Sequence, residues 1–315
     1  MKTLIQSLPK AELHLHIEGT LEPELMLQLA TKNKINLPFQ SVDEIHQAYQ
    51  FSNLQSFLDI YYFGASVLIT EQDFYDLTWA YFQKAKENNI THAEIFFDPQ
   101  THTDRGIAFE TVIKGIHQAM QDAKEKLGIT NALILCFLRH LSQEQAFATL
   151  EQAMPHLDKI KAVGLDSSEL NNPPEKFKDV FAKAAAEGLL TVAHAGEEGG
   201  ADYIWQALNL LQVRRIDHGV QAIHDDKLVA HLAETQIPLT ICPLSNKALH
   251  VFPDLAQLPL KALMDAGVCV TINSDDPAYF GGYLNDNYIA VQEALNLTEA
   301  EIRRIANNSF EASFL

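Results

Sequence analysis

The stretch that decides the fold is residues 190–219, LTVAHAGEEGGADYIWQALNLLQVRRIDHG. It contains two short runs of strand length, Leu190–Ala193 and Arg215–His218, and between them Tyr203–Leu211, whose apolar residues recur at a spacing of three and four. That spacing predicts an amphipathic helix, and short apolar runs that end in polar or glycine residues predict buried parallel strands. The stretch therefore indicates a strand, a covering helix and a second strand.

The same alternation recurs along the whole chain. Amphipathic stretches such as Val112–Leu127 and Phe177–Ala186 separate eight runs of strand length. The predicted strands are Leu13–Ile17, His92–Phe97, Ala132–Leu138, Ala162–Leu165, Leu190–Ala193, Arg215–His218, Pro238–Ile241 and Cys269–Ile272. Eight strands separated by helices predict an α/β fold of the TIM-type (β/α)8 barrel kind, built as a single domain over residues 1–315.

One connection between predicted strands is unusually long. From about Gly19 to about Thr91 the chain passes through helical patterns that include Leu54–Ile69 and Phe74–Lys86. Loops that follow barrel strands lie on the active face of the barrel. We therefore expect a helical insertion after the first strand, at about residues 20–90, which either covers the site as a lid or packs against the side of the barrel.

Composition excludes several classes of partner. The 315 residues carry a formal net charge of −18, from 23 basic and 41 acidic residues, and such a surface repels nucleic acids and anionic membranes. No apolar run approaches the ~18 residues of a membrane helix, and the first residues lack the apolar core of a signal peptide. Three cysteines without a CxxC pair favour a cytoplasmic protein. The sequence is compatible with a homo-oligomer but specifies no oligomeric state.

Histidine and carboxylate groups gather where the predicted strands end. His14 and His16 stand two residues apart, so in a strand both imidazoles point to the same face. His194 and Asp275 lie at the ends of two other strands, and the carboxyl ends of barrel strands meet at one mouth. Three imidazoles and a carboxylate suit one catalytic Zn²⁺ per chain that also holds an exchangeable water.

Two further side chains near this mouth have alternative interpretations. Glu197 follows His194 through a glycine that permits a tight turn, and it is either a proton shuttle beside the metal's water or a solvated loop carboxylate. His218 is either an additional imidazole near the metal, a base that holds the water, or a core histidine bonded to the backbone.

Asp276 follows directly after Asp275, and adjacent side chains of a regular strand cannot point the same way. We expect the pair to divide the work, one carboxylate binding the metal and the other contacting the substrate. The alternative is a capping pair before a helix that starts near Pro277.

At these positions the sequence resembles the adenosine/adenine deaminase family, from Leu8 to about Tyr288. The motifs that carry the resemblance are, in chain order, LPKAELHLHIEG (8–19), HAGEE (194–198), RIDHG (215–219), CPLSN (242–246) and NSDDPAYF (273–280). The resemblance implies an amidohydrolase-type zinc barrel that removes the amino group from C6 of a purine, with a small-molecule purine as its partner.

The resemblance also implies a role for each site residue. The implied zinc ligands are His14, His16, His194 and Asp275. Glu197 is implied to protonate the purine at N1, His218 to position and polarise the attacking water, and Asp276 to bind N7. This chemistry is sound, because a zinc-bound water has a pKa near ~7 and adds to an electron-poor C6, after which ammonia leaves.

Within the family the sequence favours free adenine, as in purine salvage. Typical adenosine deaminases carry the motif HxHLDG at the first strand, and its aspartate contacts ribose. This chain has HLHIEG instead, with Glu18 at the position of that aspartate. The longer Glu18 carboxylate is expected to contact the substrate and to intrude on the space of a ribose. The segment Gly164–Glu169 and the CPLSN and NSDDPAYFGGY motifs also resemble the adenine branch. Adenosine and an N6-substituted adenine are the alternative substrates.

Other functions fit the sequence less well. Amidohydrolases with two metals often use a modified lysine at the end of the fourth strand, and no lysine stands there. The HxE and PCxxC signature of cytidine-type zinc deaminases is absent. A non-enzymatic binding protein on the same scaffold would be free to lose ligands, yet every motif position is filled.

Overall fold

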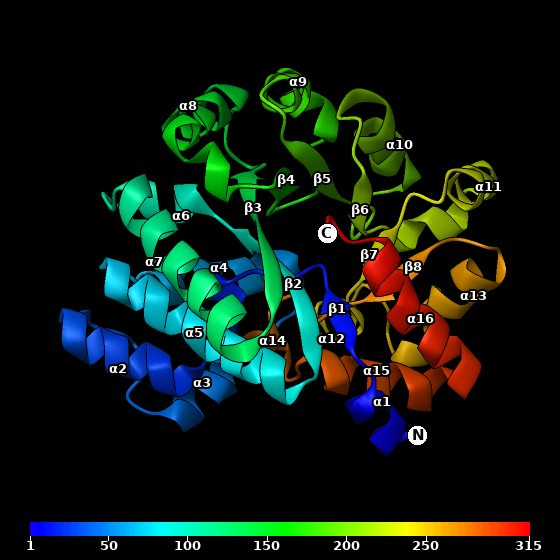
Figure 1. The fold of residues 1–315 in the computed structure, drawn as a ribbon, viewed down its shortest axis with the longest axis horizontal. Coiled ribbons are helices and arrows are strands. Elements are labelled where there is room, and N and C mark those ends of the chain that lie inside the picture. Colours follow the sequence, from blue (N-terminus) through cyan, green and yellow to red (C-terminus); the bar gives the residue numbers. More distant parts are fainter.

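Eight parallel strands form the inner ring of the molecule, and helices form the outer ring (Figure 1). The structure, a computed structural model, describes residues 1–315. In chain order the strands are β1 (Lys10–Glu12), β2 (Ile90–Phe97), β3 (Thr130–Leu138), β4 (Ala162–Asp166), β5 (Leu190–Ala195), β6 (Arg215–His218), β7 (Leu239–Ile241) and β8 (Val270–Ile272). Each strand pairs with the next one along the chain, which confirms the predicted (β/α)8 barrel.

Sixteen α-helices connect and cover the strands. They are α1 (Lys2–Ser7), α2 (Pro23–Asn33), α3 (Val42–Ala48), α4 (Leu54–Ala65), α5 (Glu71–Glu87), α6 (Pro99–Thr103), α7 (Phe109–Asp122), α8 (Gln143–Ala153), α9 (Lys178–Ala186), α10 (Ala201–Leu210), α11 (Asp226–Thr235), α12 (Pro243–Ala248), α13 (Leu260–Asp265), α14 (Pro277–Phe280), α15 (Leu284–Leu295) and α16 (Glu299–Glu311). None of them combines the length and the hydrophobicity that crossing a membrane requires.

Seven of the predicted strands lie within two residues of the observed bounds, but the first does not. The prediction placed it at Leu13–Ile17, whereas the regular ladder of β1 ends at Glu12. Beyond that residue the main-chain N–H of Leu13 donates to the side-chain oxygen of Asn273 (2.9 Å), so a side chain replaces the ladder partner. The segment that carries the two histidines then continues through isolated bridges from Leu15 to Asp275 and from His16 to Phe96.

Helix α16 fills the seam between the first and last strands. The N–H of Ala11 donates to Ser309 Oγ (2.9 Å), and the amide of Asn308 donates to the carbonyl of Val270 (2.9 Å). Strands β1 and β8 are therefore joined by side chains at this level and by main-chain bonds only nearer the mouth. This closure places the His14–His16 segment directly beside Asp275.

The connection between β1 and β2 is helical, as the sequence predicts, and its helices occupy different places. Helix α5 packs against α7 so closely that a Cβ added at Gly115 would lie 2.3 Å from the carbonyl of Glu71, so α5 belongs to the outer ring. Helix α4 lies across the mouth of the barrel and lines the pocket described below with Phe57 and Tyr61.

A buried carboxylate fastens α5 to α2. Asp73 accepts hydrogen bonds from the N–H groups of Ile69 (3.0 Å) and Thr70 (2.8 Å), from Lys32 Nζ (2.7 Å) and from the amide of Asn33 (2.9 Å). Burial alone would raise the pKa of Asp73, but these donors lower it to about 2. The carboxylate is therefore ionised in the folded protein and satisfied by four donors.

Candidate active site

A pocket of about 380 Å³ opens at the carboxyl ends of the strands, beneath α4. Its polar lining consists of imidazoles, carboxylates and hydroxyl groups, and no lysine or arginine lines it. The ionisable lining residues other than tyrosine are His16, His194, His218, Asp98, Asp166, Glu197, Asp275 and Asp276. Five carboxyl groups without a lysine or arginine among them favour a bound cation.

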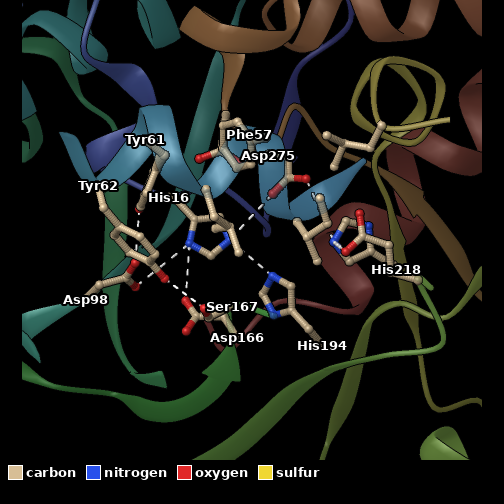
Figure 2. Close-up of a pocket in the computed structure, with 15 residues that line it drawn as sticks. His16, Phe57, Tyr61, Tyr62, Asp98, Asp166, Ser167, His194, His218 and Asp275 are labelled. Carbon is tan, nitrogen blue, oxygen red and sulfur yellow. Dashed lines mark hydrogen bonds and ion pairs between the residues drawn. The ribbon is translucent and has the colours of Figure 1, made fainter. Parts of the chain in front are cut away.

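Three imidazoles and one carboxylate converge beneath this pocket, and Figure 2 shows three of these groups, His16, His194 and Asp275. His16 Nε2 lies 3.1 Å from His194 Nε2 and 3.5 Å from Asp275 Oδ1, and His14 Nε2 lies 3.0 Å from the same Asp275 oxygen. Ligands at ~2.0–2.1 Å from a tetrahedral zinc lie roughly 3.3 Å from one another. These separations are compatible with a metal site. The ligand atoms of His14, His194, His218 and Asp275 all lie within 4.8 Å of one another, and His16 groups with Asp275 and Asp276. The structure thus brings the predicted ligands to one place, with His218 also within reach.

The outer nitrogen of His14 is held by a hydrogen bond, and that of His194 faces a carboxylate without bonding to it. His14 Nδ1 contacts Thr240 Oγ1 at 2.9 Å, and that hydroxyl donates to Asp217 Oδ1, also at 2.9 Å. His194 Nδ1 lies 3.7 Å from the other oxygen of Asp217. Such outer contacts fix a metal-ligating ring and its tautomer. Burial lowers the pKa of His16 and of His194, which keeps both rings in the neutral form that binds metal.

The backbone is strained where it presents these groups. His218, Asp275 and Ser167 have φ angles of 63°, 65° and 74°, in the left-handed region that costs free energy for residues other than glycine. All three residues line the pocket. At Asp275 the left-handed turn brings both its carboxylate and that of Asp276 to the pocket, where oxygens of the two lie within 4.8 Å of each other.

The carboxylate of Asp276 reaches the pocket because Gly19, which packs against it, has no side chain. A Cβ added at Gly19 would lie 1.9 Å from Asp276 Oδ1, so glycine is the residue that leaves room for this carboxylate. Asp276 Oδ1 is buried and has no hydrogen-bond partner. Burial and the adjacent charge of Asp275 raise the pKa of Asp276 well above the usual range of an aspartate.

Glu197 and His218 face each other beside the predicted ligands. His218 Nε2 lies 3.6 Å from Glu197 Oε2 and 3.8 Å from Asp275 Oδ2, and its Nδ1 contacts the amide of Asn246 at 3.3 Å. Burial and the charge of Asp275 raise the pKa of Glu197, and burial lowers that of His218 to about 3. The arrangement therefore holds a carboxyl group that can keep a proton next to a neutral imidazole.

A carboxylate that the sequence did not single out fixes the loop of Glu197. Glu169, three residues past β4, accepts hydrogen bonds from four consecutive N–H groups: those of Gly196 (2.6 Å), Glu197 (3.1 Å), Glu198 (2.8 Å) and Gly199 (2.8 Å). Hydrogen bonds to an ionised acceptor are the stronger kind. Glu169 thus holds the main chain of the candidate acid in one position.

Comparisons with known proteins agree with this geometry. The adenosine deaminase family model matches residues 9–315. The chain belongs to the adenosine deaminase family. It is 65% identical to adenine deaminase of Crocosphaera subtropica, over all of this chain and 97% of that one, and 60% identical to adenine deaminase of Acinetobacter baylyi, over 99% and 94%.

Solved structures of related enzymes share the fold of this chain. The crystal structure of adenine deaminase from Arthrobacter aurescens superposes with a TM-score of 0.97 at 47% identity, covering 98% of this chain and 94% of that one. An amidohydrolase from Burkholderia ambifaria, solved with bound Zn, gives a TM-score of 0.92 at 25% identity, covering 100% and 88%. The chain is thus a hydrolase on an amidohydrolase-type barrel.

One residue that the sequence assigned to the substrate in this deaminase lies behind the pocket wall. Glu18 does not line the pocket, and its Oε1 accepts from the N–H of Asp98 (3.2 Å) and contacts His102 Nε2 (2.8 Å). The wall itself is formed by Asp98, directly after β2, and by Asp166, the last residue of β4. The rule that located the other site residues, polar groups at strand ends, would have found both.

Proposed function

We propose that this deaminase converts adenine and water into hypoxanthine and ammonia, with one Zn²⁺ per chain, as a step of purine salvage. One observation carries the proposal: relatives that span the whole chain at 58–65% identity are adenine deaminases.

The chain's own residues supply the proton transfers and the orientation. When bound at His14, His16, His194 and Asp275, Zn²⁺ would supply an activated water as the nucleophile. Glu197 gives a proton to N1, which makes C6 electron-poor, while His218 orients the water towards C6. Asp276 contacts N7 and fixes the plane of the ring. The new C6–O bond forms first, and the water gives up both of its protons, one to N6 and one to restore Glu197. The C6–N6 bond then breaks and N6 leaves as ammonia.

The helical insertion would serve as the lid of this single catalytic domain. Helix α4 contributes Leu54, Phe57 and Tyr61 to the pocket, and Ser168 Oγ of the loop after β4 donates to Gln55 Oε1 at its start (2.9 Å). A closed apolar roof excludes bulk water and so strengthens the hydrogen bonds inside the site.

The test compares ammonia release from adenine and from adenosine, with kcat/KM measured for each and zinc measured by elemental analysis. We expect about one zinc per chain, strong preference for adenine, and loss of both zinc and activity in D275A. Equal or higher efficiency on adenosine would overturn the choice of substrate. Full activity in a rigorously metal-free preparation would overturn the role of the metal.

A further inference from the structure

Two carboxylates on one wall of the pocket have no task in the mechanism above. Asp98 and Asp166 are each 2% exposed and both line the pocket. Asp98 Oδ1 and both oxygens of Asp166 have no hydrogen-bond donor. Buried acceptors are normally paired, so three unpaired oxygens facing one cavity indicate donors that arrive with a ligand.

Asp98 and Asp166 interact with each other, and Asp166 also contacts the Cys136 thiol, but no cationic side chain or backbone N–H pairs with these oxygens. His16 Nδ1 lies 3.5 Å from Asp166 Oδ2 and 4.0 Å from Asp98 Oδ1, beyond good hydrogen-bond distance. Orienting His16 requires one acceptor, whereas this wall offers three. Figure 2 shows both carboxylates on the side of His16 that faces Tyr61 and Tyr62, away from His218.

Asp98 is held so that only one of its oxygens is free. Tyr61 Oη donates to Asp98 Oδ2 (3.0 Å), and Glu18 accepts the main-chain N–H of Asp98 (3.2 Å). Oδ1 is left pointing at the pocket without a donor. Oxygens of Asp98 and Asp166 lie within 4.8 Å of each other and of a ring nitrogen of His16, so a single ligand edge can reach both.

We propose, resting on the proposed function, that Asp98 and Asp166 form the subsite for the edge of the base opposite C6, and that Asp98 accepts the N9–H of free adenine. With C6 at the metal ligands, N1 at Glu197 and N7 at Asp276, the N3–N9 edge is the part of the ring that remains. A nucleoside carries a sugar carbon on N9, so it brings no donor and places bulk against two carboxylates. The carboxylate on the sugar side is thus Asp98, and Glu18 positions it from behind.

The hydroxyl of Tyr61 makes the Asp98→Asn variant informative. Because that hydroxyl donates to the Oδ2 side of the group, the amide of the variant turns its oxygen to Tyr61 and its NH₂ to the base. The variant therefore presents a donor to N9–H. In Asp166→Asn the only side-chain donor of its own protein is the Cys136 thiol, a weak one, so the amide can turn its oxygen to the ligand and the effect is smaller.

The experiment measures kcat/KM for adenine and 9-methyladenine with zinc-loaded wild type, D98N, D166N and D104N. Asp104 is exposed on the same segment after β2, which makes D104N the matched control. Wild type should prefer adenine by ~10³-fold or more, as expected for a site built to bind an N–H. D98N should reduce that preference to about tenfold or less with zinc unchanged, and D104N should match wild type.

A second readout needs no turnover. Calorimetry with hypoxanthine and 9-methylhypoxanthine should show the same preference in wild type and its loss in D98N. If D98N lowers both adenine and 9-methyladenine by one factor, or loses zinc, the carboxylates only orient His16 and the subsite is refuted. If wild type does not deaminate adenine at all, the proposed function fails, and the calorimetric preference for an N9–H still decides the subsite.

Discussion

The two ends of the barrel differ in whether their buried charged side chains have partners of opposite charge. At the end where the strands begin, Arg215 Nη1 donates to Glu94 Oε2 (2.6 Å) and Nη2 donates to the carbonyl of Leu13 (2.9 Å). The other oxygen of Glu94 contacts His92 Nε2 (3.2 Å) and accepts from the N–H of Phe314. At the mouth, five carboxylates line a pocket that no lysine or arginine lines.

This difference distinguishes the end of the barrel that contributes to stability from the end that holds the candidate active site. A buried charge without a partner destabilises a fold, so a site that serves only stability pairs its charges. The mouth instead keeps unpaired oxygens on Asp98, Asp166 and Asp276, together with left-handed backbone at His218 and Asp275. Unsatisfied groups persist where a ligand or metal satisfies them.

The largest effect is expected for the proposed acid at the mouth. Glu197→Gln keeps the shape of the side chain but removes the proton that N1 requires, so kcat on adenine should fall by ~10² to 10⁴-fold. Zinc content should stay at wild-type level, because Glu197 is not among the predicted ligands. Steady-state kinetics and elemental analysis check this, and a Gln variant with near-normal turnover would refute the role.

At the opposite end, Arg215→Met should act on stability. It leaves Glu94 buried without its main partner, and the free energy of unfolding should fall by about 3–5 kcal/mol. Adding Glu94→Gln should restore part of that loss, because the uncompensated charge is gone. Urea unfolding of the four members of this double-mutant cycle measures the coupling. Additive losses would show that the pair does not interact.

Glu169 combines features of both ends, because it is a fully hydrogen-bonded carboxylate that positions a loop of the candidate active site. Glu169→Gln places an NH₂ group against N–H donors of the loop and should shift the main chain of Glu197. We expect kcat to fall by about 10- to 100-fold with a small change in KM, as for a misplaced catalytic group. The neighbouring Glu198→Gln is the control. Equal effects in both variants would refute the positioning role.

The smallest effect is expected for Asp73, a buried carboxylate outside the barrel whose charge is also fully paired. Its pKa is about 2 in the folded protein against an ordinary 3.8, so it stabilises the fold above pH 3.8 and loses that contribution as the pH falls towards 2. Asp73→Asn should lower the free energy of unfolding at pH 6 by about 1 kcal/mol, the typical value of a helix cap. Urea unfolding should show the difference shrinking near pH 3, and a pH-independent difference would contradict it.

The sequence predicted the features that follow from local pattern. Alternating strands and helices indicated the barrel, and the strand-end rule pointed to polar groups at its mouth. The structure gathers His14, His194, His218 and Asp275 in one buried group, and His16 lies 3.5 Å from Asp275 beside it. A resemblance to a known family supplied roles that spacing alone left open. Local patterns and family motifs are both read from short stretches of chain. They indicate which functional groups belong to the site.

The features that the sequence missed depend on contacts between distant segments. The first strand was placed three residues late because the side chain of Asn273, 260 residues away, replaces a ladder bond. Glu18 was assigned to the substrate, but whether a carboxylate faces the pocket or stands behind the wall depends on the position of Asp98. Glu169 binds four N–H groups of another loop, and no pattern within its own segment indicates them.

The seam between β1 and β8 also constrains when this protein can mature. Ala11 is bonded to Ser309 across 298 positions of the chain, and α16 is synthesised after all eight strands. Contacts of such long sequence separation form late and slowly. A ribosome-bound chain therefore already carries two of the predicted metal ligands, His14 and His16, long before Asp275 exists. The complete group of predicted ligands is assembled only when the two ends of the chain meet, so the nascent chain passes through a stage in which the histidine pair lacks its carboxylate.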